Sequence, residues 1–203
     1  MYVDEWGTWY SAEPGTNPAF LNQQNTIRDA IVAGATFNIF HRHARRVKMA
    51  NIAQLVNVLQ APILTEGDNM LLTPTYHVFD MYQVHHDAAF LPVDIKTDSS
   101  TLGGESIPSV SASASRDAQG RVHLSLVNLD PKAAAAVDAR IDGQKFTSVS
   151  GRVLTAPAMD THNTFDAPNR VQPAAFTGAT LQGSSLKAQL PPRSVVVLTL
   201  AGS

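Results

Sequence analysis

The chain has 203 residues, of which 44% are hydrophobic and 16% charged, a composition typical of a folded globular protein. The formal net charge of -2 at pH 7 excludes the strong positive field that nucleic-acid binding needs. No apolar stretch reaches the roughly 18 residues that a membrane-spanning helix requires. Because there is no cysteine, disulfides and thiolate metal sites are excluded, and the sequence is compatible with any compartment.

The amino-terminal residues carry the pattern of a strand followed by a helix. Tyr2 to Glu5 predicts the end of a short strand, and Ser11 to Pro18 predicts a loop because it holds two prolines and a glycine. Thr26 followed by Asp29 is typical of a helix N-cap. The apolar residues that follow keep helical spacing as far as Phe40, which predicts a helix from about residue 26 to about 43.

A second strand and helix are predicted next. Met49 to Leu59 is a nearly continuous apolar run, which fits a strand buried on both faces of a parallel sheet. Pro62 to Asn69 is predicted to be a loop, and Thr73-Pro74 to begin a helix that ends near His86. Strand, helix, strand and helix in this order indicate two βα units.

The composition changes near residue 90, where short alternating segments replace the helical patterns. Val110–Arg116 and Arg121–Asn128 are predicted to form a hairpin, with one face of the second strand buried. Asp142-Gly143 predicts a second hairpin, between Val137–Ile141 and Lys145–Leu154. With a final strand at 194–200, these elements predict an antiparallel sandwich of about 110 residues.

Histidines occur in two close pairs, His41 with His43 and His85 with His86. Side chains on one helix face are three or four residues apart, so neither pair directs both imidazole rings to one metal ion. The sequence also lacks a Gly-x-Ser-x-Gly motif and a phosphate-binding loop. We therefore expect no metal and no cofactor.

Candidate catalytic groups lie close to the amino terminus, in the run from Met1 to Tyr10. A short apolar segment ends in Asp4 and Glu5, and tryptophans follow at positions 6 and 9. Barrel strands deliver catalytic acids in this way, and indole rings cover the flat C–H faces of sugars. The run predicts a carbohydrate-active site around Glu5.

The sequence Asp-Glu-Trp-x-x-Trp-Tyr at 4–10 resembles the nucleophile segment of the α-L-arabinofuranosidases of glycoside hydrolase family 51. Gly7 and Thr8 stand where an Asn-Val pair would be expected in that family. Further segments resemble the family in the same order along the chain: 46–48, 53–58, 61–66, 163–171 and 190–195.

The resemblance implies an α/β fragment of a (β/α)8 barrel followed by an all-β antiparallel sandwich of jelly-roll type. Residues 1–88 would be strands seven and eight of the barrel with their helices, and residues 89–203 would be the sandwich. The implied activity is that of a retaining hydrolase, which releases non-reducing-end α-L-arabinofuranosyl groups from arabinan, arabinoxylan or their oligosaccharides. A complete barrel needs about 250 residues, so we expect the chain on its own to be inactive.

The resemblance also assigns roles to residues. Glu5 would be the nucleophile at the end of the seventh strand. Gln54, on the eighth strand, would hydrogen-bond the arabinofuranosyl ring. Trp9 would form an aromatic wall near the leaving group, and Trp6 would be either wall or support. Asp4 is expected to be a structural carboxylate.

A retaining glycosidase needs a second carboxyl group as acid and base. In the family this glutamate follows an asparagine at the end of the fourth strand, which lies outside this chain. Glu13 and Glu66 follow the two predicted strands, but neither carries the Asn-Glu pair, and Glu105 lies in the predicted sandwich. None of the three is assigned as the acid.

Two alternatives stay open beside a hydrolase. One is a non-catalytic carbohydrate-binding or accessory sandwich with a remnant of the barrel, which would not need Glu5. The other is an enzyme whose missing barrel half comes from another polypeptide. In all cases the expected partner is an arabinofuranosyl-containing carbohydrate, with no nucleic acid and no membrane, and the resemblance allows a homo-oligomer of the full-length form.

Overall fold

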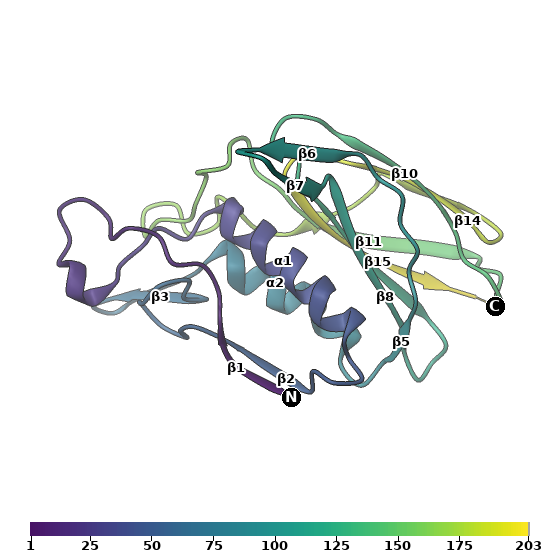
Figure 1. Cartoon of the computed structure of the whole chain (residues 1–203), viewed down its shortest axis with the longest axis horizontal. Coiled ribbons are helices and arrows are strands. Elements are labelled where there is room, and N and C mark those ends of the chain that lie inside the picture. The colour runs from purple at the N-terminus through teal and green to yellow at the C-terminus, as the bar shows by residue number, and fades with distance from the viewer. Residues whose placement is uncertain (203) are drawn as a thin grey trace.

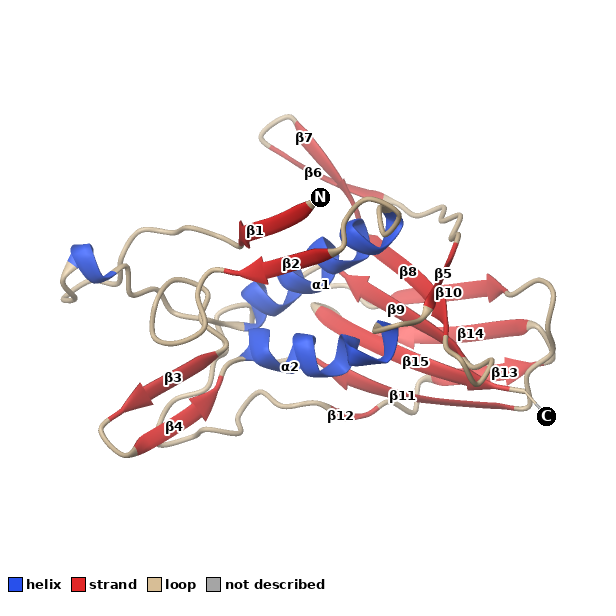
Figure 2. Ribbon diagram, turned by 90° about the horizontal axis from the view of Figure 1, so that it is seen from below, coloured by secondary structure: helices blue, strands red, loops and turns tan. Residues whose placement is uncertain are grey.

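The computed structural model describes residues 1–202, which form four stacked layers (Figures 1 and 2). A small parallel sheet lies outermost, two helices lie beneath it, and the two sheets of a sandwich follow. The first part of the chain contains β1 (Tyr2–Trp6), the 3-10 helix η1 (Pro18–Phe20), α1 (Ile27–Arg42), β2 (Met49–Ile52), β3 (Ile63–Glu66), β4 (Asn69–Leu72), α2 (Pro74–Tyr82) and the 3-10 helix η2 (Gln83–His85). None of the described helices is long and apolar enough to cross a membrane.

The rest of the chain is built of strands. They are β5 (Ala89–Leu91), β6 (Ser99–Leu102), β7 (Glu105–Pro108), β8 (Val110–Arg116), β9 (Val122–Asn128), β10 (Ala135–Arg140), β11 (Ser148–Leu154), β12 (Ala174–Ala175), β13 (Ala179–Gln182), β14 (Ser185–Leu190) and β15 (Ser194–Ala201).

The predicted strand–helix–strand unit is present. β1 pairs in parallel with β2, and α1 connects them. Thr26 and Asp29 form the predicted capping box of α1. The side chain of Thr26 accepts a hydrogen bond from a backbone amide of the first turn, and the side chain of Asp29 accepts one from the backbone amide of Thr26. The face of α1 that carries Ile27, Ile31 and Asn38 is buried.

The second predicted strand is wrong in length and burial. The strand covers only Met49–Ile52, and its residues alternate between exposed and half-buried. Among the described residues β2 pairs only with β1, so its other edge is unpaired, and the side chains of Met49 and Asn51 are exposed. The rest of the apolar run forms a loop, whose end at Leu59 is buried.

The predicted loop at 62–69 is also wrong, because β3 and β4 form an antiparallel hairpin there. Gly67 allows its tight turn with φ of +56°. The side chain of Leu71, on β4, is buried. The following helix begins at Pro74 as predicted, and ends at Tyr82 with one further 3-10 turn to His85.

The predicted antiparallel sandwich is confirmed. One sheet has the order β12-β11-β15-β9-β8-β5, the other has the order β10-β14-β13, and β6 and β7 form a separate hairpin. The predicted hairpin at the start of this region is confirmed as β8 and β9, which pair over seven residues each.

Two details of the sandwich differ from expectation. The strands on either side of Asp142-Gly143 lie in different sheets, since β10 pairs with β14 and β11 pairs with β15, so the predicted hairpin there is wrong. The turn instead carries the chain from one sheet to the other. β9 is buried on both faces rather than one, because α1 and α2 cover the face that carries its polar residues.

The six-stranded sheet therefore separates two hydrophobic cores. On one side Val127, Val195 and Val197 pack against the helices through Ile27 and Val78. The core between the two sheets contains Leu124, Leu126, Leu186, Leu190, Val196, Leu198 and Leu200. The helices thus bind the sandwich to the small parallel sheet that carries Glu5.

Candidate functional site

Glu5 lies on an irregular stretch of β1. Val3 pairs with Ala50 and Trp6 pairs with Ile52, so Asp4 and Glu5 together oppose a single residue of β2. A β-bulge of this kind re-aims side chains, and bulges are frequent next to active sites. Here both carboxylates are exposed, whereas Val3 and Trp6 are half-buried.

The indole ring of Trp6 lies among aromatic side chains of the two helices. Its centroid is 5.3 Å from that of Phe37, 5.5 Å from that of Phe40 and 6.0 Å from that of Phe79. The first two contacts are edge-to-face, a favourable geometry for aromatic pairs. Trp6 thus anchors the strand end to the helices, which favours the supporting role over that of a substrate wall.

Trp9 lies just beyond β1 and its side chain is 68% exposed. The backbone on both sides of it is fixed by buried amide side chains. Gln23 accepts from the amide of Tyr10 at 2.9 Å and donates to the carbonyl oxygen of Thr8 at 3.1 Å, and Gln60 accepts from the amide of Thr8 at 3.1 Å. An exposed indole on a fixed backbone is well suited to contact a sugar.

Gln54 lies two residues beyond β2 rather than on a strand, and it is exposed. The backbone amide of the preceding residue, Ala53, donates to the carbonyl oxygen of Trp6 at 3.0 Å. This hydrogen bond holds the residue before Gln54 against the end of β1, next to Glu5. The structure brings the loops of Gln54 and Trp9 to the same end of the parallel pair as Glu5.

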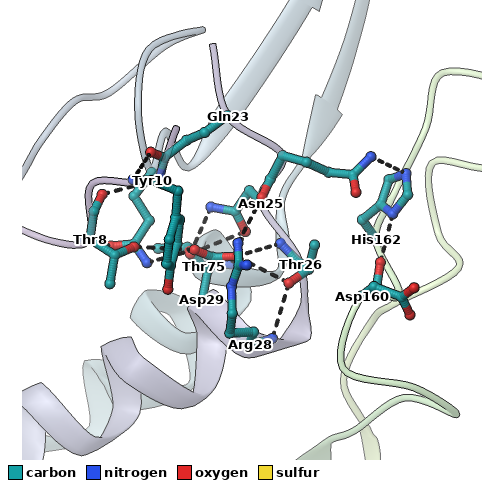
Figure 3. A network of polar contacts seen from close by, with 12 residues as sticks. Thr8, Tyr10, Gln23, Asn25, Thr26, Arg28, Asp29, Thr75, Asp160 and His162 are labelled. Atoms are coloured by element: carbon teal, nitrogen blue, oxygen red, sulfur yellow. Dashed lines mark hydrogen bonds and ion pairs between the residues drawn. The ribbon is translucent and has the colours of Figure 1, made fainter. Parts of the chain in front are cut away.

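A buried polar network beneath these loops was not predicted as a unit from the sequence. Asp29, which is 0% exposed, accepts hydrogen bonds from Thr8, Thr26 and Gln60 (Figure 3). Asn25 donates to the hydroxyl of Thr75 at 2.8 Å and so joins α1 to α2. The capping pattern identified Asp29 only as a helix cap, because its other partners are distant in sequence.

A loop of the sandwich closes over the start of α1. The amide of Ile27 donates to the carbonyl oxygen of Thr161 at 2.9 Å, and Gln24 contacts His162 at 2.9 Å (Figure 3). Asn163 is buried and donates to the carbonyl oxygen of Leu72 at 2.8 Å. These contacts support a structural role for the segment at 163–170.

Two of the histidines, His41 and His85, lie between the helices and the sheet, with their rings bonded to serines. His85 contacts Ser115 at 2.7 Å and Ser125 at 2.6 Å, and His41 contacts Ser113 at 2.9 Å. Burial, with a smaller effect of His86, lowers the pKa of His41 to about 4. Burial also lowers the pKa of His85 to about 3, with His41 adding to the effect. Within the described part of the chain, no group of three or more His, Cys, Asp or Glu is arranged to hold a metal.

A cavity of about 1330 Å³ lies within the sandwich, away from Glu5. It is lined by the segment at 91–100 and by β8, β9 and β10, with no residue from β1 or β2. The carboxylate, amide and indole groups described above therefore lie outside it, on an open face.

Comparison with known proteins gives consistent matches. The family model described as the α-L-arabinofuranosidase C-terminal domain matches residues 4–194. An intracellular exo-α-L-arabinofuranosidase of Bacteroides ovatus is 44% identical over 201 residues, covering 98% of this chain and 39% of the relative. An intracellular exo-α-(1->5)-L-arabinofuranosidase of Streptomyces lividans is 31% identical, covering 96% of this chain and 31% of the relative.

Among solved structures, the GH51 arabinofuranosidase of Xanthomonas axonopodis pv. citri superposes with a TM-score of 0.95 at 51% identity. The match covers 98% of this chain and 40% of that one. The chain thus spans well under half the length of the proteins it resembles, and its fold is that of the corresponding part of the Xanthomonas enzyme.

Proposed function

The chain belongs to the family of α-L-arabinofuranosidase C-terminal domains, and we propose that it is the carboxyl-terminal part of a retaining glycoside hydrolase. The enzyme would release non-reducing-end α-L-arabinofuranosyl groups from arabinan, arabinoxylan or their oligosaccharides. The names of the Bacteroides and Streptomyces relatives support the reaction class.

The observation that carries the proposal is the bulged end of β1. It turns the carboxylate of Glu5 to the open face, beside the loops of Trp9 and Gln54. A binding module has no need of a carboxylate placed in this way. Glu5 is assigned as nucleophile, Gln54 as a hydrogen-bonding partner of the sugar ring, and Trp9 as an aromatic wall.

The chemistry proceeds in two displacements. The ionised carboxylate of Glu5 attacks the anomeric carbon, and the bond to the leaving oxygen breaks as that oxygen takes a proton from a second carboxyl group. The second group then removes a proton from water, whose oxygen attacks the anomeric carbon and frees Glu5. We assign the second carboxyl group to a part of the enzyme outside this chain.

We further propose that residues 1–88 are the seventh and eighth βα units of a (β/α)8 barrel and that residues 89–203 are its jelly-roll-like sandwich. The parallel pairing of β1 with β2 supports this assignment. So do exposed apolar side chains on the outer strands and helix, where Tyr2 is 70%, Met49 49% and Ile39 46% exposed. A neighbouring βα unit on each side would cover them.

The experiment uses two proteins. One is this chain alone, and the other is a chimera in which this chain replaces the corresponding carboxyl-terminal part of the Bacteroides relative. On an aryl α-L-arabinofuranoside we expect the chain alone to be inactive and the chimera to be active. Turnover by the chain alone near that of the relative, or a folded but inactive chimera, would refute the proposal.

Two variants of the chimera test the assignment of the nucleophile. Glu5→Gln is expected to lower kcat by at least about a thousandfold, because the first displacement loses its attacking group. The matched control is Glu66→Gln on the exposed β3–β4 hairpin, which is expected to change kcat less than about threefold. Equal losses in the two variants would remove the assignment.

A further inference from the structure

The carboxylate of Asp29 is completely buried and makes contact only with donors in the described network. Its Oδ2 accepts from the amide of Thr26 at 2.8 Å, from the hydroxyl of Thr26 at 3.1 Å and from Arg28 at 3.3 Å. Its Oδ1 accepts from the side-chain amide nitrogen, Nε2, of Gln60 at 3.1 Å and from the hydroxyl of Thr8 at 3.3 Å. Both oxygens of the carboxylate therefore act as acceptors.

The two oxygens serve different parts of the fold. The contacts of Oδ2 lie within the first turn of α1 and complete the helix cap. The contacts of Oδ1 are not needed by the helix. They join the loop after β1, through Thr8, to the loop after β2, through Gln60.

Gln60 extends the connection to both candidate site loops. It is 0% exposed, its Oε1 accepts from the amide of Thr8, and its backbone amide donates to the carbonyl oxygen of Ala53 at 3.3 Å. Ala53 directly precedes Gln54. Gly7 permits the close approach, since it has φ of +144° and a Cβ there would lie 2.8 Å from Oε1 of Gln60.

Gln23 holds the other side of Trp9. Its side chain bonds both the carbonyl oxygen of Thr8 and the amide of Tyr10 (Figure 3). Trp9 is thus exposed while the residues before and after it are fixed. Groups held in place before a ligand binds lose less entropy on binding, and small displacements of such groups are costly for catalysis.

We propose that Asp29 is a positioning residue which, through Gln60 and Thr8, fixes the loop after β1 to the loop after β2 and so sets where Trp9 stands relative to Gln54. Its relevance to sugar cleavage rests on the proposed function. The position of the loops does not, and it is measurable in this chain alone.

The loop after β1 contributes Gly7 and Thr8 to this network. Thr8 supplies a hydroxyl for Oδ1 of Asp29, and Gly7 leaves room for Gln60. Thr8→Val removes that hydroxyl while keeping nearly the same shape.

The spectroscopic test uses the two tryptophans, which give two ¹⁹F resonances after 5-fluorotryptophan labelling. Trp9→Phe assigns them. In Asp29→Asn, an amide N–H₂ replaces one accepting oxygen, and we expect the Trp9 resonance to move toward that of the free amino acid. The Trp6 resonance should stay in place because its ring is held by Phe37, Phe40 and Phe79.

Amide hydrogen exchange provides the second readout. The amide of Thr8, bonded to Gln60, is expected to exchange at least about tenfold faster in Asp29→Asn. The matched control is Thr26→Ala, which damages the cap of α1 but leaves both contacts of Oδ1 in place. At Thr8 this control should stay within about threefold of the unchanged chain.

Equal exchange rates and equal Trp9 resonances in Asp29→Asn and Thr26→Ala would overturn the proposal. If Asp29→Asn does not fold, Thr8→Val takes its place, with the same shift of the Trp9 resonance expected. An unchanged Trp9 resonance in Thr8→Val would then refute the tie.

The activity test uses the chimera described above. Asp29→Asn is expected to lower kcat/KM by about 10- to 100-fold per folded enzyme, with an unchanged pH profile, because the reacting groups are intact but displaced. An active chimera in which this value does not change would refute the positioning role. An inactive chimera together with the expected ¹⁹F and exchange changes would refute the proposed function and leave the loop tie supported.

Discussion

Acidification is expected to weaken the contact between the helices and the six-stranded sheet. His41 and His85 lie there, with ring centroids 4.6 Å apart and ring nitrogens bonded to serines of β8 and β9. Burial lowers the pKa of both, to about 4 and about 3, from 6.5. The neighbouring His86 and His123 add to the effect on His85.

The direction in which stability changes with pH follows from which state binds more protons. Between pH 6.5 and 4 the unfolded chain binds protons at these histidines and the folded chain does not, so stability falls as the pH falls. The stability that the two neutral histidines contribute is fully present above pH 6.5, and it is lost as the pH falls toward their pKa values in the folded chain. At pH 5 each histidine costs about 2 kcal/mol relative to pH 8, so the two together cost about 4 kcal/mol.

The assay is urea unfolding followed by tryptophan fluorescence at pH 8 and pH 5. His85→Gln is expected to reduce the loss by about 2 kcal/mol, because the contribution of its ring is gone. The control is His43→Gln, an exposed position at the end of α1, which should keep the full loss. Burial raises the pKa of Asp117, but hydrogen bonds from Arg121 and His123 outweigh burial and hold it at about 2, so this carboxylate stays ionised at pH 5.

A free energy of unfolding that stays constant from pH 8 to pH 5 would refute this reasoning. So would a loss in His85→Gln as large as that of the unchanged chain. Either result would mean that the rings are not held neutral between helix and sheet.

Three further substitutions test the packing by urea unfolding. Gly7→Ala should cost about 1–3 kcal/mol, because φ is +144° and the new Cβ would meet Gln60; no loss would contradict the close approach of Gln60 to this backbone. Gly151→Ala should cost about 1–3 kcal/mol, because its Cβ would lie 2.5 Å from Cδ2 of Leu198. A neutral effect would mean that the Leu198 side chain moves aside at little cost. Asn163→Ala should cost about 2 kcal/mol, since the backbone groups of Leu72 and Val171 lose their partner; unchanged stability would show that water replaces the amide.

Local signals in the sequence were sufficient where the structure is local. Thr26 and Asp29 form the predicted capping box because both partners lie in one turn. The β8–β9 pair was predictable because the turn at 117–120 joins two alternating segments. Asp142-Gly143 gives the same kind of signal, yet the strands beside it choose different partners, and a turn motif carries no information about that choice.

The prediction of burial was wrong where elements distant in the sequence cover a surface. His123 and Ser125 of β9 have the pattern of a solvent-facing side, but helices supply the cover, and Ser125 bonds to His85. The exposed strand at Met49–Ile52 shows the reverse error. Its apolar run predicts two buried faces, which the described residues do not provide.

The candidate site was predictable in part. The residues at 4–10 pointed to Glu5 and Trp9, and the segment at 53–58 pointed to Gln54, through a family resemblance. Their support through Gln60 and Asp29 was not, because those residues are 31 positions apart and meet only after β1, α1 and β2 have assembled. The bulge at Asp4 and Glu5 likewise depends on pairing with β2.

The role of Glu5 is tested most directly by identifying the residue that becomes glycosylated. The chimera would be treated with an activated 2-fluoro-α-L-arabinofuranoside, which slows breakdown of a glycosyl-enzyme, and the adduct located by peptide mass spectrometry. We expect one arabinofuranosyl adduct, on Glu5. An adduct on another carboxylate, or none on the peptide of Glu5 in an active chimera, would contradict the assignment of Glu5 as nucleophile.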